Sequence, residues 1–354
     1  MKLDKLLAVD PFDMDDIEKE NLFLELLNDK HSFHFKNCYE YSEISKRIFN
    51  NINYKVEKIE EMPFLPVSIF KNYNLKSILD SEIYKILTSS GTTGQAVSKI
   101  FLDRETAALQ TRVLTKILNK VIGQKRLPML IVDSKSVLKN RSQFSARGAG
   151  ILGLSVFGKD HQYLLDDNFS INEQILIEFK RKYDGEEVLI FGFTYMIWQY
   201  LISSNVSIDL SNAILLHSGG WKKMLEISVD NETFKSRLKN KFNLTRVYNF
   251  YGMVEQVGSV FLEDSTGDLH CPIFADIIIR NPLDLTVVKD GEVGLIQTLS
   301  VLPKSYPGHS LLTEDLGVIT GRNVDVNGWK GKSFKILGRT KKAELRGCSD
   351  TFKQ

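Results

Sequence analysis

The sequence lacks several features that would assign it to a familiar class of protein. It has three cysteines in 354 residues, Cys38, Cys271 and Cys348, which are far apart and odd in number. Their spacing argues against a disulfide framework and a zinc cluster, and it favours a reducing, cytoplasmic setting. His31 and His34 lie near Cys38, but no fourth ligand is apparent, which favours a mixed polar surface over a metal site.

Long apolar runs and strong charge are also missing. No run approaches the roughly 18–20 apolar residues of a membrane span, and the N-terminus has no apolar signal core. The net charge of +2 gives no general indication of binding to nucleic acid or to an anionic membrane. We therefore expect a globular protein with no membrane span and no nucleic-acid partner.

Two common nucleotide-binding motifs are absent or out of context. Gly94 is followed by glutamine rather than by lysine and Ser/Thr, so the spacing of the P-loop NTPases is missing. Gly148–Gly153 match the dinucleotide pattern G-x-G-x-x-G, but the preceding residues 140–147 are polar and do not resemble an apolar strand. A close-packed helix start or the wall of an acyl pocket fits this glycine-rich segment better than a nicotinamide site.

The most informative stretch is rich in glycine and hydroxyl groups and lies between two short predicted strands, residues 83–87 and 100–102. Glycines allow a tight turn, while hydroxyls, free N–H groups and a lysine attract phosphate oxygens. The stretch thus predicts a phosphate-binding loop, although an ordinary polar hairpin turn is the alternative. Its candidate ligand-binding residues are Ser89, Ser90, Gly91, Thr92, Thr93, Gly94 and Lys99.

The pattern along the chain predicts an α/β fold. Residues 1–60 look helical and amphipathic, and Asp103 is a candidate cap for a helix that ends near Gly123. Strands then alternate with helices over residues 127–252, which indicates a largely parallel, helix-covered sheet. The predicted strands of this sheet are Leu127–Val132, Val188–Phe193, Ala213–Leu216 and Arg246–Phe250.

From Cys271 onward, short strands separated by turn signals predict an antiparallel meander or barrel. These strands are expected at residues 277–279, 285–288, 293–299, 317–320 and 334–337.

Two glycine-containing turns, at Gly219-Gly220 and at Tyr251-Gly252, follow strands of the predicted parallel sheet. Ligands of such sheets bind at the carboxyl ends of the strands. Glu255 follows the second turn, and a carboxylate near a bound triphosphate commonly holds Mg²⁺. The alternative is a glutamate that only interacts with the dipole at a helix N-terminus.

Two charged residues near the C-terminal end complete the candidate set. Asp315 lies in Thr-Glu-Asp-Leu-Gly, which we expect to form a turn leading into a strand, where a carboxylate can accept both ribose hydroxyls. The alternative is an ordinary aspartate turn. Arg339 follows the last predicted strand and can reach ribose or phosphate, unless it belongs to a solvated basic tail.

The order of these motifs resembles that of the adenylate-forming acyl-CoA synthetases, and most closely that of the LuxE-type acyl-protein synthetases. The resemblance covers most of the chain and is weakest over residues 1–60, and Val254 replaces a threonine usual in the wider family. The motifs of the wider family are Ser89–Gly94, Ser218–Gly220, Tyr251–Glu255, Thr313–Gly317 and Gly338-Arg339 with Arg346-Gly347. The narrower match rests on Pro63–Val67, Ser89–Lys99, His217–Lys223 and Arg346–Ser349.

The resemblance implies the N-terminal domain of an adenylate-forming enzyme, with helix-covered, largely parallel sheets and a smaller antiparallel, barrel-like part. It implies a helical segment over 1–60, an adenylation domain over 61–332, and a truncated tail over 333–354 in place of the full C-terminal domain. That domain carries a catalytic lysine in longer relatives. Its positive charge would then come from Lys99, Lys222, Lys341 or Arg339.

The resemblance further implies ATP- and Mg²⁺-dependent activation of a long-chain fatty acid, and transfer of the acyl group to Cys348 as a thioester. Glycines 219 and 220 would lie against the adenine, Asp315 would bind ribose, and Glu255 would hold Mg²⁺. An acyl-protein reductase of the LuxC type would be the natural partner, and the oligomeric state stays open. The alternatives are a ligase that uses free coenzyme A and a non-catalytic acyl- or nucleotide-binding subunit.

Overall fold

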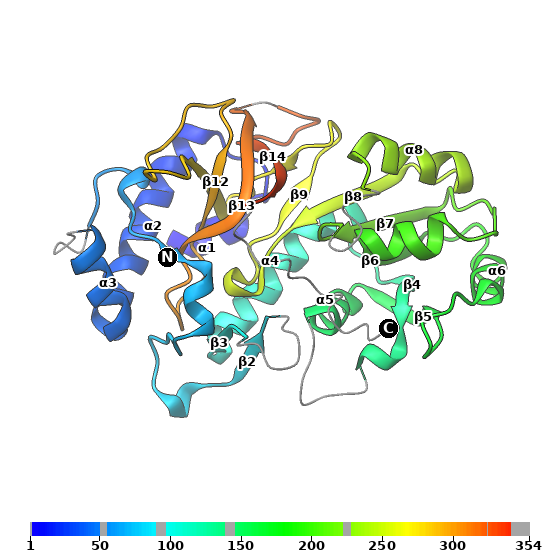
Figure 1. The fold of residues 1–354 in the computed structure, drawn as a ribbon, viewed down its shortest axis with the longest axis horizontal. Helices are drawn as coiled ribbons and strands as arrows, with labels where there is room; N and C mark the ends of the chain where they lie inside the picture. The colour runs from blue at the N-terminus through cyan, green and yellow to red at the C-terminus, as the bar shows by residue number, and fades with distance from the viewer. Residues whose placement is uncertain are drawn as a thin grey trace. The chain divides into compact units, whose positions relative to one another are not determined.

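The computed structural model contains two compact units, which are drawn in Figure 1. Unit 1 takes its described residues from 2–89, 97–117 and 252–340, and unit 2 takes them from 118–251. The structure describes residues 2–49, 55–89, 97–138, 146–221, 228–323 and 325–340.

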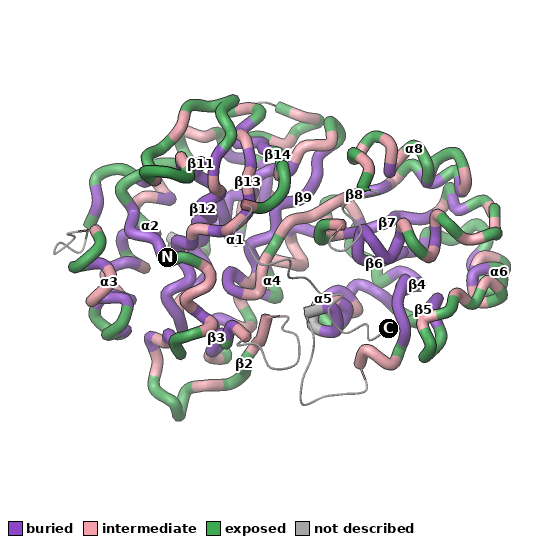
Figure 2. The backbone as a smooth tube through the Cα atoms, in the orientation of Figure 1, coloured by how far each residue is buried: buried purple, intermediate pink, exposed green. Residues whose placement is uncertain are grey.

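Unit 2 is built on a parallel sheet with the strand order β8-β7-β6-β4-β5. The four predicted strands are confirmed. Three of them, β4, β6 and β7, are mainly buried, whereas β8 is mainly half-buried (Figure 2). Such near-continuous apolar runs are typical of parallel strands covered on both faces. The strands are β4 (Leu127–Ser134), β5 (Gly158–Leu165), β6 (Val188–Phe193), β7 (Ala213–Ser218) and β8 (Arg246–Tyr251).

The helices of unit 2 connect these strands, and α8 runs alongside β7 and β8 (Figure 1). A helix follows β6, in line with the predicted alternation of strands and helices, and its second part is a π-helix. These elements are η4 (Lys135–Leu138), α5 (Ala146–Ser155), α6 (Glu173–Lys182), α7 (Thr194–Met196), the π-helix η5 (Ile197–Ile202) and α8 (Asn231–Phe242).

Unit 1 contains an antiparallel meander, as predicted. Its strands β11, β12, β13 and β14 are neighbours in chain order, and β14 also pairs with β10, which pairs with β9. The predicted strand at 285–288 is wrong, because this segment forms only an isolated bridge from Val287 to Arg280. The strands are β9 (Phe261–Glu263), β10 (Leu269–His270), β11 (Ala275–Arg280), β12 (Gly294–Ser300), β13 (Ser310–Gly321) and β14 (Ser333–Arg339).

The remaining elements of unit 1 come mainly from the N-terminal part of the chain. The predicted helices form as α1 (Lys2–Ala8), α2 (Asp16–Asn37) and α3 (Tyr39–Phe49). β1 (Leu65–Pro66) pairs in parallel with β13, and β2 (Lys85–Thr88) pairs with β3 (Lys99–Leu102) as an antiparallel hairpin. Short 3₁₀ turns are η1 (Ile59–Glu61), η2 (Val67–Lys71), η3 (Asp80–Glu82) and η7 (Val254–Gln256).

The helix predicted after β3 is α4 (Arg104–Ile122), and both of its predicted ends are confirmed. At its start, the N–H of Thr106 donates to Oδ1 of Asp103 at 2.7 Å. At its end, Gly123 has φ +81°, a left-handed conformation that glycine adopts without strain.

Three buried histidines, His31, His34 and His309, form a cluster in unit 1. The Tyr41 hydroxyl lies 2.7 Å from Nδ1 of His31 and 3.1 Å from Nε2 of His309. The rings of His34 and His309 stack at 5.0 Å, and Nδ1 of His34 lies 2.8 Å from Oγ of Ser77. The expected polar surface around His31 and His34 is therefore wrong. Both side chains are fully buried, because their partners come from distant parts of the chain.

This cluster should make the protein sensitive to acid. Burial lowers the pKa of His34 from 6.5 to about 3, and it also lowers that of His309. The unfolded chain takes up these protons below pH 6.5 while the folded chain does not, so the free energy of unfolding should fall as pH drops below 6.5. The contribution of each histidine is about 1.4 kcal/mol per pH unit.

The variant His34→Asn, whose amide can replace Nδ1 beside Ser77, should show a shallower pH dependence than the wild type. Urea unfolding above and below pH 6.5 measures the difference. His161→Gln is the control, because this histidine is exposed and should leave the dependence unchanged. An equal slope in the wild type and in His34→Asn would contradict the assignment.

Candidate active site

Two hydrogen bonds close the base of the predicted phosphate-binding loop. The N–H of Ser89 donates to the Ser98 carbonyl at 3.1 Å, and the N–H of Ser98 donates to the Ser89 hydroxyl at 2.9 Å. Next to them, Thr88 and Lys99 are paired across the β2–β3 hairpin. The predicted strand–turn–strand is thus confirmed in its strands. Ser90, Gly91, Thr92, Thr93 and Gly94 lie outside the described residues.

Glu255 lies beside this closed base, within unit 1. Glu255 is the middle residue of η7 and is 8% exposed. Burial raises the pKa of its carboxyl above the ordinary 4.5, while the Ser98 hydroxyl and the charges of Lys71 and Arg339 act in the opposite direction. A desolvated carboxylate therefore lies close to the end of the loop and to two cations.

The surroundings of η7 explain how Glu255 is held. Its neighbour Gln256 is buried and donates from Nε2 to the carbonyls of Gly308, at 3.0 Å, and Thr298, at 3.2 Å. These bonds fix η7 against the end of the meander. Because η7 is a single 3₁₀ turn of three residues, the alternative of a glutamate that serves only a helix dipole receives little support.

Asp315 and Arg339, which the sequence suggested separately, form one ion pair. They are partners across β13 and β14, and Nε of Arg339 donates to Oδ1 of Asp315 at 2.8 Å. The expected turn at Asp315 is wrong, because this residue lies inside β13 and is 8% exposed. Arg339 is the last residue of β14 and pairs with Asp315, although its side chain is 47% exposed.

The register of the two strands shifts directly after this pair, between Leu316 and Gly317. Gly338, next to Arg339, has φ +135°, which side chains rarely adopt. An irregularity of this kind commonly directs a side chain at the edge of a site. Since the charge of Arg339 also acts on Glu255, the structure brings Ser98, Glu255, Asp315 and Arg339 into one neighbourhood of unit 1.

Within unit 2, the Gly219-Gly220 turn follows β7, as predicted. Gly219 has φ +83°, so a side chain there would be strained. The Thr194 hydroxyl lies 3.0 Å from Nδ1 of His217 and donates to the Ser218 carbonyl at 3.3 Å, which fixes the strand end. Burial lowers the pKa of His217 to about 3, so its imidazole is neutral at physiological pH.

The second predicted turn begins where β8 ends, at Tyr251. A side chain at Gly252 would place its Cβ 3.3 Å from the Ser259 carbonyl, which is tighter than most real contacts. Glycine at this position therefore allows the backbone of residues 252 and 259 to approach closely.

A buried ion pair at the carboxyl end of β4 was not predicted. Nε of Arg147 in α5 lies 3.0 Å from Oδ2 of Asp133, and each side chain is 2% exposed. The Arg147 guanidinium also lies 5.0 Å from the ring of Phe169 and 3.5 Å from the Tyr195 hydroxyl. Burial raises the pKa of Asp133 to about 6, although the charge of Arg147 lowers it.

The helix that carries Arg147 also contains the glycine-rich segment that follows it. Gly148–Gly153 lie inside α5 rather than at a strand-to-helix turn, in agreement with the rejection of a dinucleotide site. A Cβ at Gly150 would lie 3.2 Å from the ring of Phe193, so glycine allows close packing between the helix and β6.

The two described cysteines are buried and are not expected to be reactive nucleophiles. Cys38 and Cys271 are both free and buried, and burial raises the pKa of the Cys38 thiol to about 11 and that of Cys271 further. Neither thiol would form a reactive thiolate near neutral pH. Cys348, Lys222 and Lys341 lie outside the described residues.

No group of three or more histidine, cysteine, aspartate or glutamate side chains among the described residues is arranged to hold a metal ion. None of the described helices is long and apolar enough to cross a membrane.

Solved structures of other proteins identify the fold. A 2-hydroxyisobutyryl-CoA ligase in complex with 2-HIB-AMP has a TM-score of 0.69 and 13% identity, over 93% of this chain and 69% of that chain. An ATP-bound chimera of MatB has a TM-score of 0.51 and 16% identity, over 74% of this chain and 49% of that chain. The fold is therefore that of the adenylate-forming ligases.

Sequence relatives define the class more narrowly. The model of the family "Acyl-protein synthetase, LuxE" matches residues 2–354, and the chain belongs to this family. A long-chain-fatty-acid–luciferin-component ligase of Aliivibrio fischeri is 23% identical over 94% of this chain and 88% of its own length. Its counterpart from Vibrio harveyi is 22% identical over 95% of this chain and 89% of its own length. The resemblance seen in the motifs is thereby confirmed, and the protein is a ligase.

Proposed function

We propose that this LuxE-family ligase uses ATP to activate a long-chain fatty acid as an acyl-adenylate, and then transfers the acyl group to Cys348 as a thioester. The main support is the buried Glu255 carboxylate, which interacts with Ser98 at the base of the glycine-rich loop and with the charge of Arg339, the partner of Asp315. The names of the relatives support a fatty acid as the substrate class.

In the first step, an oxygen of the fatty carboxylate attacks the α-phosphorus of ATP. The bond from the α-phosphorus to the bridging oxygen breaks, and pyrophosphate leaves with both electrons. Such a reaction depends on positioning and on stabilisation of negative charge. Residues 89–94 and Lys99 would hold the pyrophosphate side, and the two hydrogen bonds between Ser89 and Ser98 would keep the ends of this loop in place.

Glu255 fits the role of a magnesium ligand. Mg²⁺ in phosphoryl-transfer sites is usually held by one or two carboxylates together with substrate phosphates. Glu255 supplies one hard oxygen donor, and its burial leaves the carboxylate with incomplete compensation of its charge. When bound, the ion would offset negative charge on the phosphates.

The nucleoside would be held by residues of the two predicted turns and of the ion pair. Gly219 and Gly220 would lie flat against adenine, beside the Tyr251-Gly252 turn, because no side chain intervenes at the glycines. Asp315 would accept the ribose hydroxyls, and Arg339, which already donates to Asp315, would approach ribose or phosphate.

In the second step, the Cys348 thiolate attacks the acyl carbonyl carbon, and the bond from this carbon to the phosphate oxygen breaks to release AMP. Lys341, Lys342 and Arg346 are close in sequence and would favour loss of the thiol proton. The raised pKa values of Cys38 and Cys271 make these two thiols poor competitors. A thioester on the protein would then be collected by an acyl-protein reductase.

One labelling experiment tests the proposal. Incubation with a radiolabelled fatty acid, ATP and Mg²⁺ should label the protein, and neutral hydroxylamine should remove the label because it cleaves thioesters. Cys348→Ser should abolish the label but not the release of pyrophosphate. Cys38→Ser is the matched control, since this buried thiol should not accept the acyl group.

The other outcomes identify the alternatives. Formation of soluble acyl-CoA only when coenzyme A is added would indicate a coenzyme A ligase. Absence of ATP-dependent pyrophosphate release would indicate a non-catalytic subunit. Label that survives in Cys348→Ser would place the acceptor elsewhere.

A further inference from the structure

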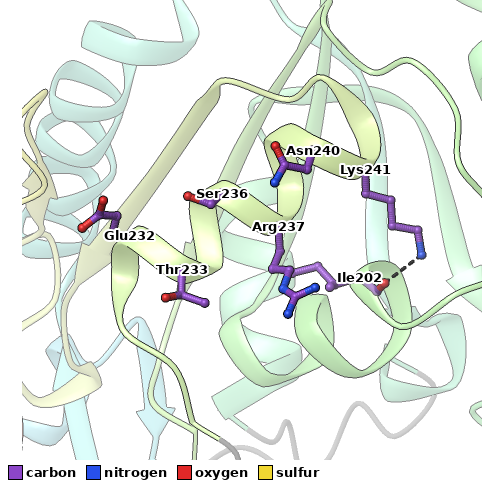
Figure 3. A pocket seen from close by; sticks show the side chains of 7 residues that line it. All are labelled: Ile202, Glu232, Thr233, Ser236, Arg237, Asn240 and Lys241. Atoms are coloured by element: carbon purple, nitrogen blue, oxygen red, sulfur yellow. Dashed lines mark hydrogen bonds between the residues drawn. The ribbon is translucent and has the colours of Figure 1, made fainter.

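Unit 2 has a hollow on its surface that the proposed function does not use. Its volume is about 420 Å³, and it lies between α8 and the last residue of η5, Ile202 (Figure 3). Apart from Ile202, the lining consists of polar and charged side chains of α8. They are Glu232, Thr233, Ser236, Arg237, Asn240 and Lys241.

The sequence of α8 gives the helix a net positive charge, and in the lining of the hollow Arg237 and Lys241 outweigh Glu232. Phe234, Leu238 and Phe242 recur every four residues, are buried, and fix the helix on unit 2. The rest of the helix carries four basic residues and one acidic residue, a balance of +3. The acidic residue is Glu232, and the basic residues are Lys235, Arg237, Lys239 and Lys241.

The two cations in the hollow, Lys241 and Arg237, differ in their hydrogen bonding. Nζ of Lys241 donates to the Ile202 carbonyl at 2.7 Å and also to the Ser204 carbonyl, so the ammonium is fixed at one end of the hollow (Figure 3). Arg237 is exposed, and its guanidinium has no hydrogen bond or ion pair to any other described residue. Its planar set of N–H donors is therefore available for a carboxylate, which it can bind through two bonds.

Aromatic side chains of η5 and α8, the two elements that border the hollow, pack against each other and against Trp221. Trp198 of η5 and Trp221 are both half-buried, and their rings lie 5.3 Å apart. Phe234 of α8 stacks on Trp198 at 6.3 Å, and it lies one helical turn before Arg237. Tryptophan and arginine are the residue types most enriched at the energetic centres of protein interfaces.

The lining distinguishes between a small ligand and a protein partner. Pockets for small molecules are mostly apolar and enclose their ligand, with only a few polar groups. This hollow has one apolar residue in its lining, and its polar residues lie on one exposed helix face. Its positive charge and the adjacent tryptophan pair suit a protein surface that presents carboxylates beside an apolar side chain.

We infer that the α8–η5 face is a docking surface for an acidic segment of a partner protein. A carboxylate of this segment binds Arg237, the fixed positive charge of Lys241 attracts it, and a neighbouring apolar side chain packs against Trp198 and Trp221. This inference does not depend on the chemistry proposed above, because it concerns binding alone.

A fluorescein-labelled peptide of alternating glutamate and leucine is a direct probe, read by fluorescence anisotropy at physiological ionic strength, where the screening length is about 8 Å. The wild type should bind it, and Arg237→Glu should weaken binding by about tenfold or more, because the replacement puts like charges opposite each other. Lys239→Glu is the matched control. It makes the same change of charge at an exposed position of α8 that does not line the hollow, and it should weaken binding by less than about twofold.

Several results would overturn the inference. These are no binding of the glutamate peptide, equal binding of a peptide with glutamine in place of glutamate, and equal losses in the two variants. Displacement of the peptide by inorganic phosphate or coenzyme A through Arg237 would indicate a small-anion site instead. ATP-dependent pyrophosphate release and the melting temperature should be unchanged in both variants, which separates this test from that of the proposed activity.

Discussion

Replacement of Lys99 by alanine should lower ATP-dependent acyl-adenylate formation by about 10³-fold, close to the background of a pyrophosphate-release assay. Lys99 begins β3, directly after Ser98, whose backbone closes the base of the glycine-rich loop. Its side chain is exposed and has no hydrogen bond or ion pair to any other described residue. Its loss should therefore remove positive charge from the pyrophosphate side without removing a contact that stabilises the fold.

Lys85→Ala is the control for this experiment. Lys85 is also an exposed lysine of the β2–β3 hairpin, but it pairs with Leu102 at the end of the hairpin away from the loop. Its replacement should leave pyrophosphate release within about twofold of the wild type and should change the melting temperature as little as Lys99→Ala does. Full activity in Lys99→Ala would show that the loop had been assigned wrongly.

Glu255→Gln should separate activity from stability. The substitution removes the negative charge but keeps the shape of the side chain, and pyrophosphate release should fall by about 10²–10³-fold. Because burial raises the pKa of this carboxyl, the charged form is disfavoured in the folded protein at neutral pH. The neutral amide removes that penalty, so the free energy of unfolding should stay equal or increase.

The same carboxyl predicts how the magnesium requirement depends on pH. Mg²⁺ binds the ionised form, whose population falls as pH decreases toward the raised pKa, which lies above 4.5. The concentration of Mg²⁺ needed for half-maximal activity should therefore rise in weak acid in the wild type, and it should change less in Glu255→Gln. Glu105→Gln, at an exposed glutamate paired with Lys304, is the control.

A glutamine variant that is inactive but also strongly destabilised would argue that Glu255 has a structural role. A variant with normal activity and a normal magnesium requirement would exclude it as a ligand. Titration of Mg²⁺ at several pH values, combined with urea unfolding at neutral pH, gives both readouts from one preparation.

The sequence was informative wherever one segment carries its own pattern. The buried strands of unit 2 are apolar runs bounded by turn residues, and their positions were predicted to within a few residues. β5 was missed because its sequence, Gly-Lys-Asp-His-Gln-Tyr-Leu-Leu, is polar at the start and lies at the edge of the sheet. The cap at Asp103 was predictable because a helix start depends on only four consecutive residues.

Pairings between distant residues could not be predicted in this way. Asp315 and Arg339 were each chosen from a short motif, but only the register of two strands shows that they form an ion pair. Nothing in the sequence indicated that Asp133 and Arg147 form a buried ion pair, since a charge at a strand end is normally solvated. Burial of a charged or polar group depends on what the rest of the chain places over it.

The pairing of Asp315 with Arg339 makes the candidate site sensitive to strand slippage. Side chains alternate between the two faces of a sheet, so a shift of one residue between β13 and β14 would turn Arg339 away from the aspartate. A substitution that lets the register slip would thus disconnect the two charges while the meander remains folded. In the proposed mechanism, the register of two strands, and not only the identity of two side chains, is therefore a condition for nucleotide binding.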